Sequence, residues 1–200
     1  MKKKKILNLF IGSNNPGKIK EIRDLLPKTY KVFSPKDFKL KSPKENGKSF
    51  LQNSLIKAEY YSKKSGKICI ADDSGLEIDI LNKAPGIFSA RYAGKKASDK
   101  ENRERIIKKL NKLGVKDLDA YYVCILVGIR SHDDPMPIIA EGRIFGKVSV
   151  KSSGNGGFGY DKIFYPDNYS CSMASIDSKV KNKISHRAIA SGTVSYTHLT

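Results

Sequence analysis

The 200-residue sequence predicts an α/β protein built on a mixed β-sheet. In the first half of the chain, apolar runs of strand length alternate with segments of helical periodicity, which is typical of α/β folds. The second half is richer in β-branched and aromatic residues that alternate with period two, which predicts antiparallel strands. No apolar run approaches the roughly 20 residues that cross a bilayer, so a membrane-spanning protein is not indicated.

The first 48 residues predict two strands and one helix. An apolar stretch over residues 4–12 predicts the first strand, and Tyr30–Phe33 predicts the second. Lys18–Leu26 predicts a helix, because its apolar residues recur at helical spacing and Pro27 ends it. Residues 34–48 contain two prolines and many charges, which favours a loop.

Two further helices carry capping signals at both ends. Ser49 has a glutamine three residues later, as in a capping box, and Gly66 closes the helix that follows. Ser98 has an acid at the same spacing and begins a helix that Gly114 closes. Between the two helices we expect a strand over 68–72.

A second, separate extended piece is expected at Leu76–Leu81. The intervening Ala71-Asp72-Asp73-Ser74-Gly75 then lies at the tip of a strand and in a turn. Strand tips of α/β proteins are where binding and catalytic residues gather.

The second half predicts a set of antiparallel strands at Tyr121–Ile129, Ile138–Arg143 and Gly146–Val150. A glycine-rich loop over residues 152–160 and a short strand at 163–165 follow.

The end of the chain predicts a helix that begins at His186 and stops at Ser191 and Gly192. Because the last residues have no apolar periodicity, we interpret 191–200 as a tail foreign to the native chain and 1–190 as one domain.

The chain is strongly basic, with a formal net charge of +18. This charge favours anionic partners. However, only seven of the 38 basic residues are arginines, and nucleic-acid readers rely on arginine forks and stacked aromatics. Dispersed lysine instead indicates a solvated surface that can also steer a small anionic substrate. The three cysteines show no CxxC spacing, which predicts free thiols and a reducing, cytoplasmic location.

A polar turn follows the first predicted strand and leads into a helix. Its residues are Ser13, Asn14, Asn15, Pro16, Gly17 and Lys18. The spacing is not that of a Walker A loop. Backbone N–H groups at a helix start, beside a lysine, are nevertheless suited to phosphate. An ordinary strand–helix turn with an exposed lysine remains the alternative.

Adjacent carboxylates at Asp72 and Asp73 repel each other unless a cation or a proton lies between them. One could bind Mg²⁺, which prefers oxygen ligands, and another could accept a proton from water. Glu45, in the charged loop, is a candidate further ligand. The alternatives are an Asp-Ser-Gly turn and a solvated loop acid.

Two motifs near the C-terminus could recognise a base. Phe158 and Tyr160 in the glycine-rich loop could stack on a planar ring, and Asp161 could accept from base or ribose donors. His186 and its neighbours at a helix start could donate to carbonyl or phosphate oxygens. A flexible hairpin and a solvated, capped helix start are the alternatives. No zinc-ligand spacing and no compelling Ser-His-Asp set is present.

In combination, these motifs resemble the inosine triphosphate pyrophosphatase family, the nonstandard-purine nucleoside triphosphatases. The resemblance runs from about Ile6 to Ile189. It rests on Ser13-x-Asn15-x-x-Lys18, Glu45-x-Gly47-x-x-Phe50, Asn53-x-x-x-Lys57-Ala58, Ala71-Asp72-Asp73-Ser74-Gly75-Leu76, Pro85-Gly86-Ile87-x-Ser89-Ala90-Arg91-Tyr92, Gly156-Gly157-Phe158-Gly159-Tyr160-Asp161 and Ser185-His186-Arg187.

The resemblance implies an elongated mixed sheet flanked by helices, two lobes with a cleft between them, and a homodimer. It implies Mg²⁺-dependent hydrolysis of ITP, dITP or XTP to the monophosphate and pyrophosphate. The implied triphosphate-binding residues are Ser13, Asn14, Asn15, Pro16, Gly17 and Lys18. Glu45 and Asp73 would hold Mg²⁺, and Asp73 would also accept the proton of the attacking water. Lys57 and Asp72 would support this phosphate and metal site. The remaining implied substrate contacts are Ser74, Phe158, Gly159, Tyr160, Asp161, Lys181, His186 and Arg187.

A donor such as Arg187 or His186 could favour a 6-keto purine over adenine, because adenine would leave that donor unpaired. Two alternatives remain open at this point. A Maf-like nucleotide pyrophosphatase would have a similar fold and a different base preference. A basic nucleic-acid-binding module would fit the charge, but two carboxylates in its cleft would repel a polyphosphate backbone.

Overall fold

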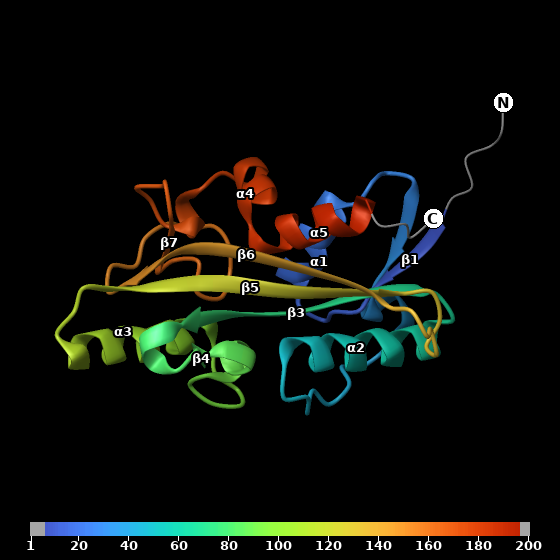
Figure 1. The fold of residues 1–200 in the computed structure, drawn as a ribbon, viewed down its shortest axis with the longest axis horizontal. Coiled ribbons are helices and arrows are strands. Elements are labelled where there is room, and N and C mark those ends of the chain that lie inside the picture. Colours follow the sequence, from blue (N-terminus) through green and yellow to red (C-terminus); the bar gives the residue numbers. More distant parts are fainter. Residues whose placement is uncertain (1–6, 197–200) are drawn as a thin grey trace. The chain divides into compact units, whose positions relative to one another are not determined.

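The computed structural model describes residues 7–196 and has an α/β fold with a seven-stranded mixed sheet (Figure 1). The strands are β1 (Leu7–Ile11), β2 (Tyr30–Phe33), β3 (Ile68–Ile78), β4 (Ala84–Pro85), β5 (Asp117–Ile129), β6 (Ile138–Ser149) and β7 (Phe164–Pro166). The helices are α1 (Pro16–Leu25), α2 (Phe50–Ser65), α3 (Asp99–Leu113), α4 (Ser178–Ile184) and α5 (His186–Tyr196). The predicted fold class is therefore confirmed.

The sheet has the strand order β2-β1-β3-β5-β6-β7, with β4 beside β3. β1 pairs in parallel with both β2 and β3, whereas β4 is antiparallel to β3 and β7 is antiparallel to β6. Parallel pairing at β1 follows from the helical crossovers α1 and α2, which return the chain to the same edge before each new strand.

The chain divides into two compact units. Unit 1 comprises Met1–Asp73, Cys124–Gly142 and Arg187–Thr200, and unit 2 comprises Ser74–Val123 and Arg143–His186. Strands β3, β5 and β6 contribute residues to both units. Two units agree with the expectation of two lobes, and the cleft expected between them stays a prediction.

Unit 1 has helices on both faces of its strands, with α2 on one face and α1 and α5 on the other (Figure 1). Alternation along β1 separates the two cores. Leu9 and Ile11 pack with α1 and α5, whereas Phe10 between them packs with α2. Period-two alternation of apolar side chains is what a strand buried on both faces requires.

Unit 2 has a single core in which α3 packs on the strands through Ile106 and Leu110. Helix α3 begins with the predicted capping box, because Ser98 accepts from the backbone N–H of Glu101 and the Glu101 carboxylate accepts from the N–H of Ser98. Gly114 ends it in the left-handed conformation, as its position in the sequence indicates.

Two predicted interruptions are wrong. β3 runs unbroken from Ile68 to Ile78, so Asp72 and Asp73 lie within a strand and not at its tip. β6 likewise continues from Ile138 to Ser149 through residues predicted as a break. Glycine and paired acids favour turns locally, and here the ladder of neighbouring strands outweighs that preference.

The predicted end of the last helix is also wrong. α5 continues past Gly192 to Tyr196, and Val194 packs with Ala190 in a core of unit 1. Whether 191–200 is foreign to the native chain stays a prediction. Residues 197–200 lie outside the described residues, as do residues 4–6 of the first predicted strand. α4 and the short β4 were not predicted. Within the described part of the chain, no helix has the length and apolar character needed to span a bilayer.

Candidate functional site

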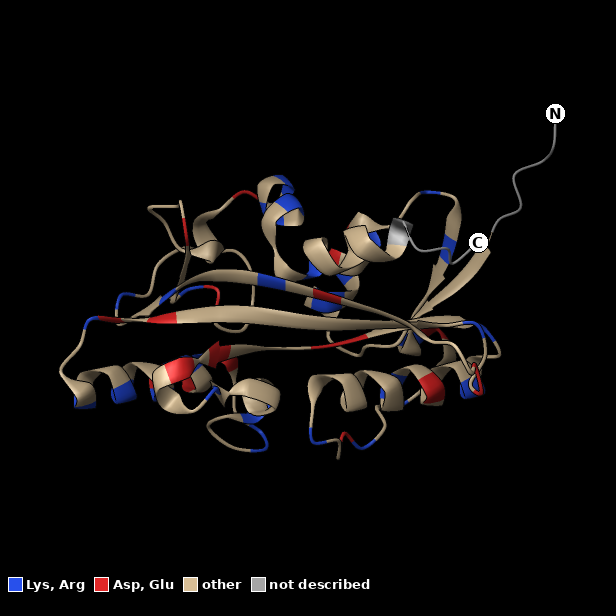
Figure 2. Cartoon of the chain, viewed as in Figure 1, with Lys and Arg blue, Asp and Glu red and all other residues tan. Residues whose placement is uncertain are grey.

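The centre of unit 1 is a buried network of acids and bases around Asp72. Figure 2 shows acidic residues in the middle of β3, where Asp72 and Asp73 lie. Oδ2 of Asp72 lies 3.1 Å from Nζ of Lys18 and accepts from Nε of Arg187 at 3.1 Å. Arg187 also donates through Nη1 to Glu21 of α1. The network thus joins α1, β3 and α5, which are far apart in the sequence.

Burial alone would raise the pKa of Asp72, but Lys18 and Arg187 hold that pKa well below its ordinary value. Asp72 is therefore an anion at neutral pH. Its second oxygen, Oδ1, is buried and accepts no hydrogen bond within residues 7–196. A buried carboxylate oxygen without a donor is costly, so this atom is suited to a further donor such as a bound water.

Beside it, Asp73 and Glu45 converge on one ammonium group. Nζ of Lys57 lies 3.2 Å from Oδ1 of Asp73 and 3.0 Å from Oε2 of Glu45. Burial disfavours the charged form of Lys57, but the carboxylates of Asp73, Asp72 and Glu45 together raise its pKa. Lys57 is therefore a cation, and it neutralises two acids that would otherwise repel each other.

Asp73 differs electrostatically from its neighbour in sequence. Burial raises the pKa of Asp73 above its ordinary value, and the attraction of Lys57 and Lys18 only partly offsets this effect. Asn53 of α2 orients the carboxylate by donating to Oδ2 at 3.1 Å, and its own Oδ1 accepts from the N–H of Gly47 at 2.9 Å. A carboxyl with a raised pKa is the better proton acceptor of the two.

The predicted phosphate turn is close to the network through Lys18, but its backbone donors are already in use. Oδ1 of Asn15 caps α1 by accepting from the N–H groups of Gly17 and Lys18, at 2.9 and 3.2 Å. Asn14 donates to Ser42 and Tyr61, and Ser13 accepts from the N–H of Asn15. Asn15 thus occupies the N–H groups of Gly17 and Lys18 in this structure, and phosphate binding by this turn stays a prediction.

The donor set of unit 1 fits magnesium. The network has four carboxylates (Glu21, Glu45, Asp72 and Asp73) and three cations (Lys18, Lys57 and Arg187). No group of three or more His, Cys, Asp or Glu side chains in residues 7–196 is arranged to hold a metal ion. Mg²⁺ in nucleotide-binding proteins commonly takes one or two carboxylates and completes its shell with phosphates and water. Two converging carboxylates and the free oxygen of Asp72 satisfy that requirement.

In unit 2, Asp161 is the residue on which the predicted base-binding groups converge. Its Oδ2 accepts from Nζ of Lys181 at 2.7 Å and from the N–H of Phe158 at 3.0 Å. Its Oδ1 accepts from the hydroxyl of Tyr122 at 3.3 Å. Nζ of Lys181 also lies 5.2 Å from the centre of the Phe158 ring. Asp161 therefore holds both the loop and the lysine in place.

The glycine-rich loop is fixed at two more points. The N–H of Gly159 donates to Asp99 at 2.7 Å, and the carbonyl of Gly159 accepts from Arg103 at 2.7 Å, so both contacts come from α3. Tyr160 is buried in the core of unit 2 and donates to the carbonyl of Ser89. The ring of Tyr160 therefore packs inside the protein, and its stacking on a base stays a prediction.

His186 lies in unit 2 with its imidazole stacked on Tyr122, with the ring centres 4.7 Å apart and the planes 5° apart. Ser74 is half-buried on β3. Arg187, the next residue after His186, belongs to unit 1, where Glu21 and Asp72 hold its guanidinium. The structure thus brings the predicted residues together in two sets, one in each unit.

Sequence reasoning missed Glu21, Tyr122, Asp99 and Arg103. In the sequence, Glu21 looks like a solvent-facing residue of an amphipathic helix. Only the fold shows that Arg187 donates to it. Tyr122 reads as one of several aromatic strand residues. Asn53 and Lys57 belong to one of the sequence motifs named above. They are four residues apart on α2, and this spacing indicates that their side chains lie on the same side of the helix.

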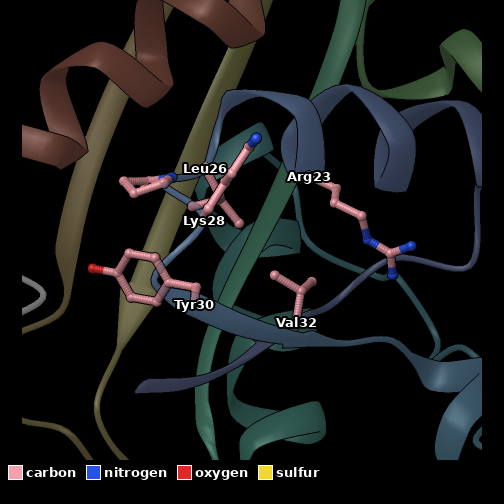
Figure 3. Close-up of a pocket in the computed structure, with 6 residues that line it drawn as sticks. Arg23, Leu26, Lys28, Tyr30 and Val32 are labelled. Atoms are coloured by element: carbon pink, nitrogen blue, oxygen red, sulfur yellow. The ribbon is translucent and has the colours of Figure 1, made fainter. Parts of the chain in front are cut away.

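Unit 1 also contains a hollow of about 400 Å³ at the C-terminal end of α1 (Figure 3). It is lined by Arg23, Leu26, Pro27, Lys28, Tyr30 and Val32. Its lining contains no carboxylate and none of the predicted site residues, so it is distinct from the network around Asp72.

The fold and the two residue sets define an α/β protein with an acid-rich, cation-balanced network in one unit and a glycine-loop site in the other. A sequence profile of the Ham1 family matches residues 9–195. Two curated relatives are named dITP/XTP pyrophosphatase. The one from Legionella pneumophila (strain Paris) is 43% identical over 91% of this chain and 93% of its own, and the one from Haemophilus influenzae is 41% identical over 91% and 94%.

Among solved structures, a HAM1 protein from Coxiella burnetii superposes with a TM-score of 0.86 at 36% identity, covering 96% of this chain and 98% of its own. The Staphylococcus aureus Ham1 protein superposes with a TM-score of 0.81 at 34% identity, covering 95% and 97%. The chain belongs to the Ham1 family. These similarities confirm the resemblance to nonstandard-purine triphosphatases and lend no support to a Maf-like enzyme or a nucleic-acid-binding module.

Proposed function

We propose that this protein hydrolyses nonstandard purine nucleoside triphosphates, namely ITP, dITP and XTP, to the nucleoside monophosphate and pyrophosphate. The observation that carries the proposal is the convergence of the Asp73 and Glu45 carboxylates on Lys57, next to the Lys18–Asp72 pair. Family membership supports the same reaction, since relatives 43% and 41% identical are named dITP/XTP pyrophosphatase.

The reaction breaks the anhydride bond between the α- and β-phosphates, and water supplies the oxygen. Asp73 accepts the proton of that water, since its raised pKa makes it a better base than an ordinary aspartate. Asn53 and Lys57 hold its two oxygens in place. Lys18 supplies positive charge to the phosphate oxygens.

Magnesium held by Glu45 and Asp73 would neutralise the phosphate oxygens and so complete the charge balance. The network has one more carboxylate than it has cations, so a triphosphate would meet a surplus of negative charge without a dication. Because of this excess negative charge, we propose that the reaction strictly requires the metal.

Recognition of the base is proposed for unit 2. Phe158 supplies a ring for stacking, and Lys181 and His186 supply donors for the 6-keto oxygen. Adenine has an amino donor where these purines have the 6-keto oxygen. Binding adenine would therefore leave a protein donor unpaired, and this loss can discriminate strongly against ATP. Because Arg187 belongs to unit 1, where Glu21 and Asp72 hold it, and His186 and Lys181 belong to unit 2, we propose His186 and Lys181 as the base readers.

The proposal also covers the location and the oligomeric state of the protein. We propose a cytoplasmic enzyme, which agrees with three free cysteines. We also propose a homodimer, which light scattering at micromolar concentration tests directly.

The experiment is pyrophosphate release from dITP, XTP, ATP and dTTP, with Mg²⁺ and with a chelator present. We expect release from dITP and XTP only, and only with the metal. Asp73→Asn should lose at least about 100-fold in kcat, since general-base catalysis contributes roughly 10²–10⁴-fold. Asp24→Asn is the matched control, because Asp24 is a partly exposed acid of α1 that pairs with the exposed Lys20. A preference for dTTP, or full activity in Asp73→Asn, would overturn the proposal.

A further inference from the structure

Tyr122 contacts His186, a proposed base-binding residue, and Asp161, which holds Lys181 and Phe158 in place, through different parts of its side chain. Its ring stacks on the imidazole of His186, and its hydroxyl donates to Asp161 at 3.3 Å. Phe164 packs against the ring from the side, with centres 4.8 Å apart and planes at 64°. Tyr122 is 7% exposed and has little freedom to move.

The stack fixes the plane of the His186 ring. Imidazole N–H groups lie in the ring plane, so the direction in which His186 donates depends on rotation about its χ2 torsion, which has broad preferences of its own. A parallel aromatic ring at 4.7 Å removes that freedom, because rotation would break the contact between the two faces. The donor of His186 is thereby aimed before a substrate arrives.

The hydroxyl of Tyr122 acts on Lys181 and Phe158 through Asp161. Asp161 accepts from Lys181 and from the N–H of Phe158, so its position sets both the lysine and the stacking ring. The bond from Tyr122 occupies the remaining oxygen, Oδ1, and stops the carboxylate from rotating. Tyr122 on β5 therefore fixes the orientation of His186 directly and that of Lys181 through Asp161.

We propose that Tyr122 is a positioning residue for base selection, acting through His186 and Asp161. This inference rests on the proposed function and goes beyond it, by assigning a specificity role to a residue that has no part in breaking the phosphate anhydride. Its two contacts are separable, because Tyr122→Phe keeps the ring and removes the hydroxyl, whereas Tyr122→Leu removes both.

The test measures kcat and KM for dITP, XTP and ATP in the wild type, in Tyr122→Phe and in Tyr122→Leu. For Tyr122→Phe we expect KM for dITP to rise roughly 2- to 10-fold, because the hydroxyl acts on the base only through Asp161, with the preference over ATP kept. For Tyr122→Leu we expect KM to rise by at least about 10-fold and the dITP-to-ATP preference in kcat/KM to fall at least about 10-fold. In both variants kcat should change by less than about threefold, because Asp73 and Lys57 are unaltered.

Ile106→Val is the control for a merely structural effect. Ile106 is fully buried in the same core as Tyr122 and lies on α3. It should lose about 0.5–1.5 kcal/mol of stability and keep the base preference. A rise in KM that Ile106→Val shares, or an unchanged preference in Tyr122→Leu, would overturn the inference.

The two proposals fail in different ways. A wild type that releases no pyrophosphate from dITP or XTP overturns the proposed function and this inference with it. An active wild type whose Tyr122→Leu variant keeps wild-type KM and preference overturns the inference alone. If Tyr122→Leu does not fold, Tyr122→Phe still decides, since an unchanged KM for dITP refutes the role of the hydroxyl bond to Asp161.

Discussion

Replacing Arg187 by methionine removes the cation that joins two buried acids. Arg187 is 2% exposed, and it donates to Asp72 and Glu21, which are 1% and 9% exposed. Breaking a buried ion pair by removing one partner costs about 3–5 kcal/mol, because a charge is left buried without compensation. Asp72 keeps Lys18 at 3.1 Å, so we expect the lower end of this range, about 3 kcal/mol.

The assay is equilibrium unfolding in urea. With a slope of about 2–3 kcal/mol per molar, as expected for a chain of this size, a loss of 3 kcal/mol lowers the midpoint by about 1–1.5 M. Lys20→Met is the control, because Lys20 forms an exposed pair with Asp24 on α1 that is worth about 0.3–0.5 kcal/mol. A midpoint for Arg187→Met within about 0.2 M of this control would refute the reasoning.

A second variant separates buried charge from lost packing. Adding Glu21→Leu to Arg187→Met removes one of the two acids that lose this cation, and replacing a buried pair with apolar residues is often close to neutral. The double variant should therefore regain at least about 1 kcal/mol. If it is less stable than Arg187→Met alone, the arginine acts mainly through packing of its stem.

The effect should also depend on pH in a defined direction. In the folded wild type the pKa of Asp72 lies well below its ordinary value, so Asp72 contributes stability above the unfolded pKa of about 3.9. That stability is lost as the pH falls from there toward the folded pKa. Arg187→Met removes one of the cations that lower this pKa. The difference in midpoint between wild type and variant should therefore be full at pH 7 and shrink below about pH 4.

Three further outcomes are expected. Gly157→Ala should cost clearly more stability than Gly159→Ala in thermal unfolding: both have a positive φ (68° and 59°), but only at Gly157 would a Cβ lie 2.1 Å from the Asp161 carboxylate. Ser98→Ala should cost about 1 kcal/mol of helix stability in the same assay, because its hydroxyl caps α3. A disulfide reagent should modify Cys171 first in the native protein, since burial raises the pKa of the other two thiols, and all three should react equally in denaturant.

Local signals predicted α1, α2 and α3 well, because the ends of these helices are determined by nearby residues. Ser49 and Gly66 bound α2 as predicted, and both caps form within the helix itself. β3 was divided in the prediction because Asp72 to Gly75 looks like a turn. Its continuity depends on neighbouring strands that are distant in sequence, and no local pattern reports their presence.

The same distinction holds for the site. Asp73, Glu45 and Lys57 lie in motifs that could be recognised one by one, whereas their convergence depends on packing α2 against β3. Arg187 shows the limit most clearly. Next to His186 in the sequence, it was grouped with the base-binding residues, yet the first turn of α5 directs it to Glu21 and Asp72. Consecutive helical residues point about 100° apart, so adjacency in sequence does not imply a shared target.

Composition misleads about charge for a related reason. A net charge of +18 with 31 lysines predicts a uniformly attractive surface for polyphosphates. Lys18 and Lys57, however, are buried or nearly so and paired to carboxylates, and the network around them has more acids than cations. The long-range field can therefore draw a triphosphate toward the protein, while the residues that would meet it repel it at short range. The magnesium requirement proposed above would reconcile this attraction at long range with the repulsion at short range, because the triphosphate would then bind together with its own cation.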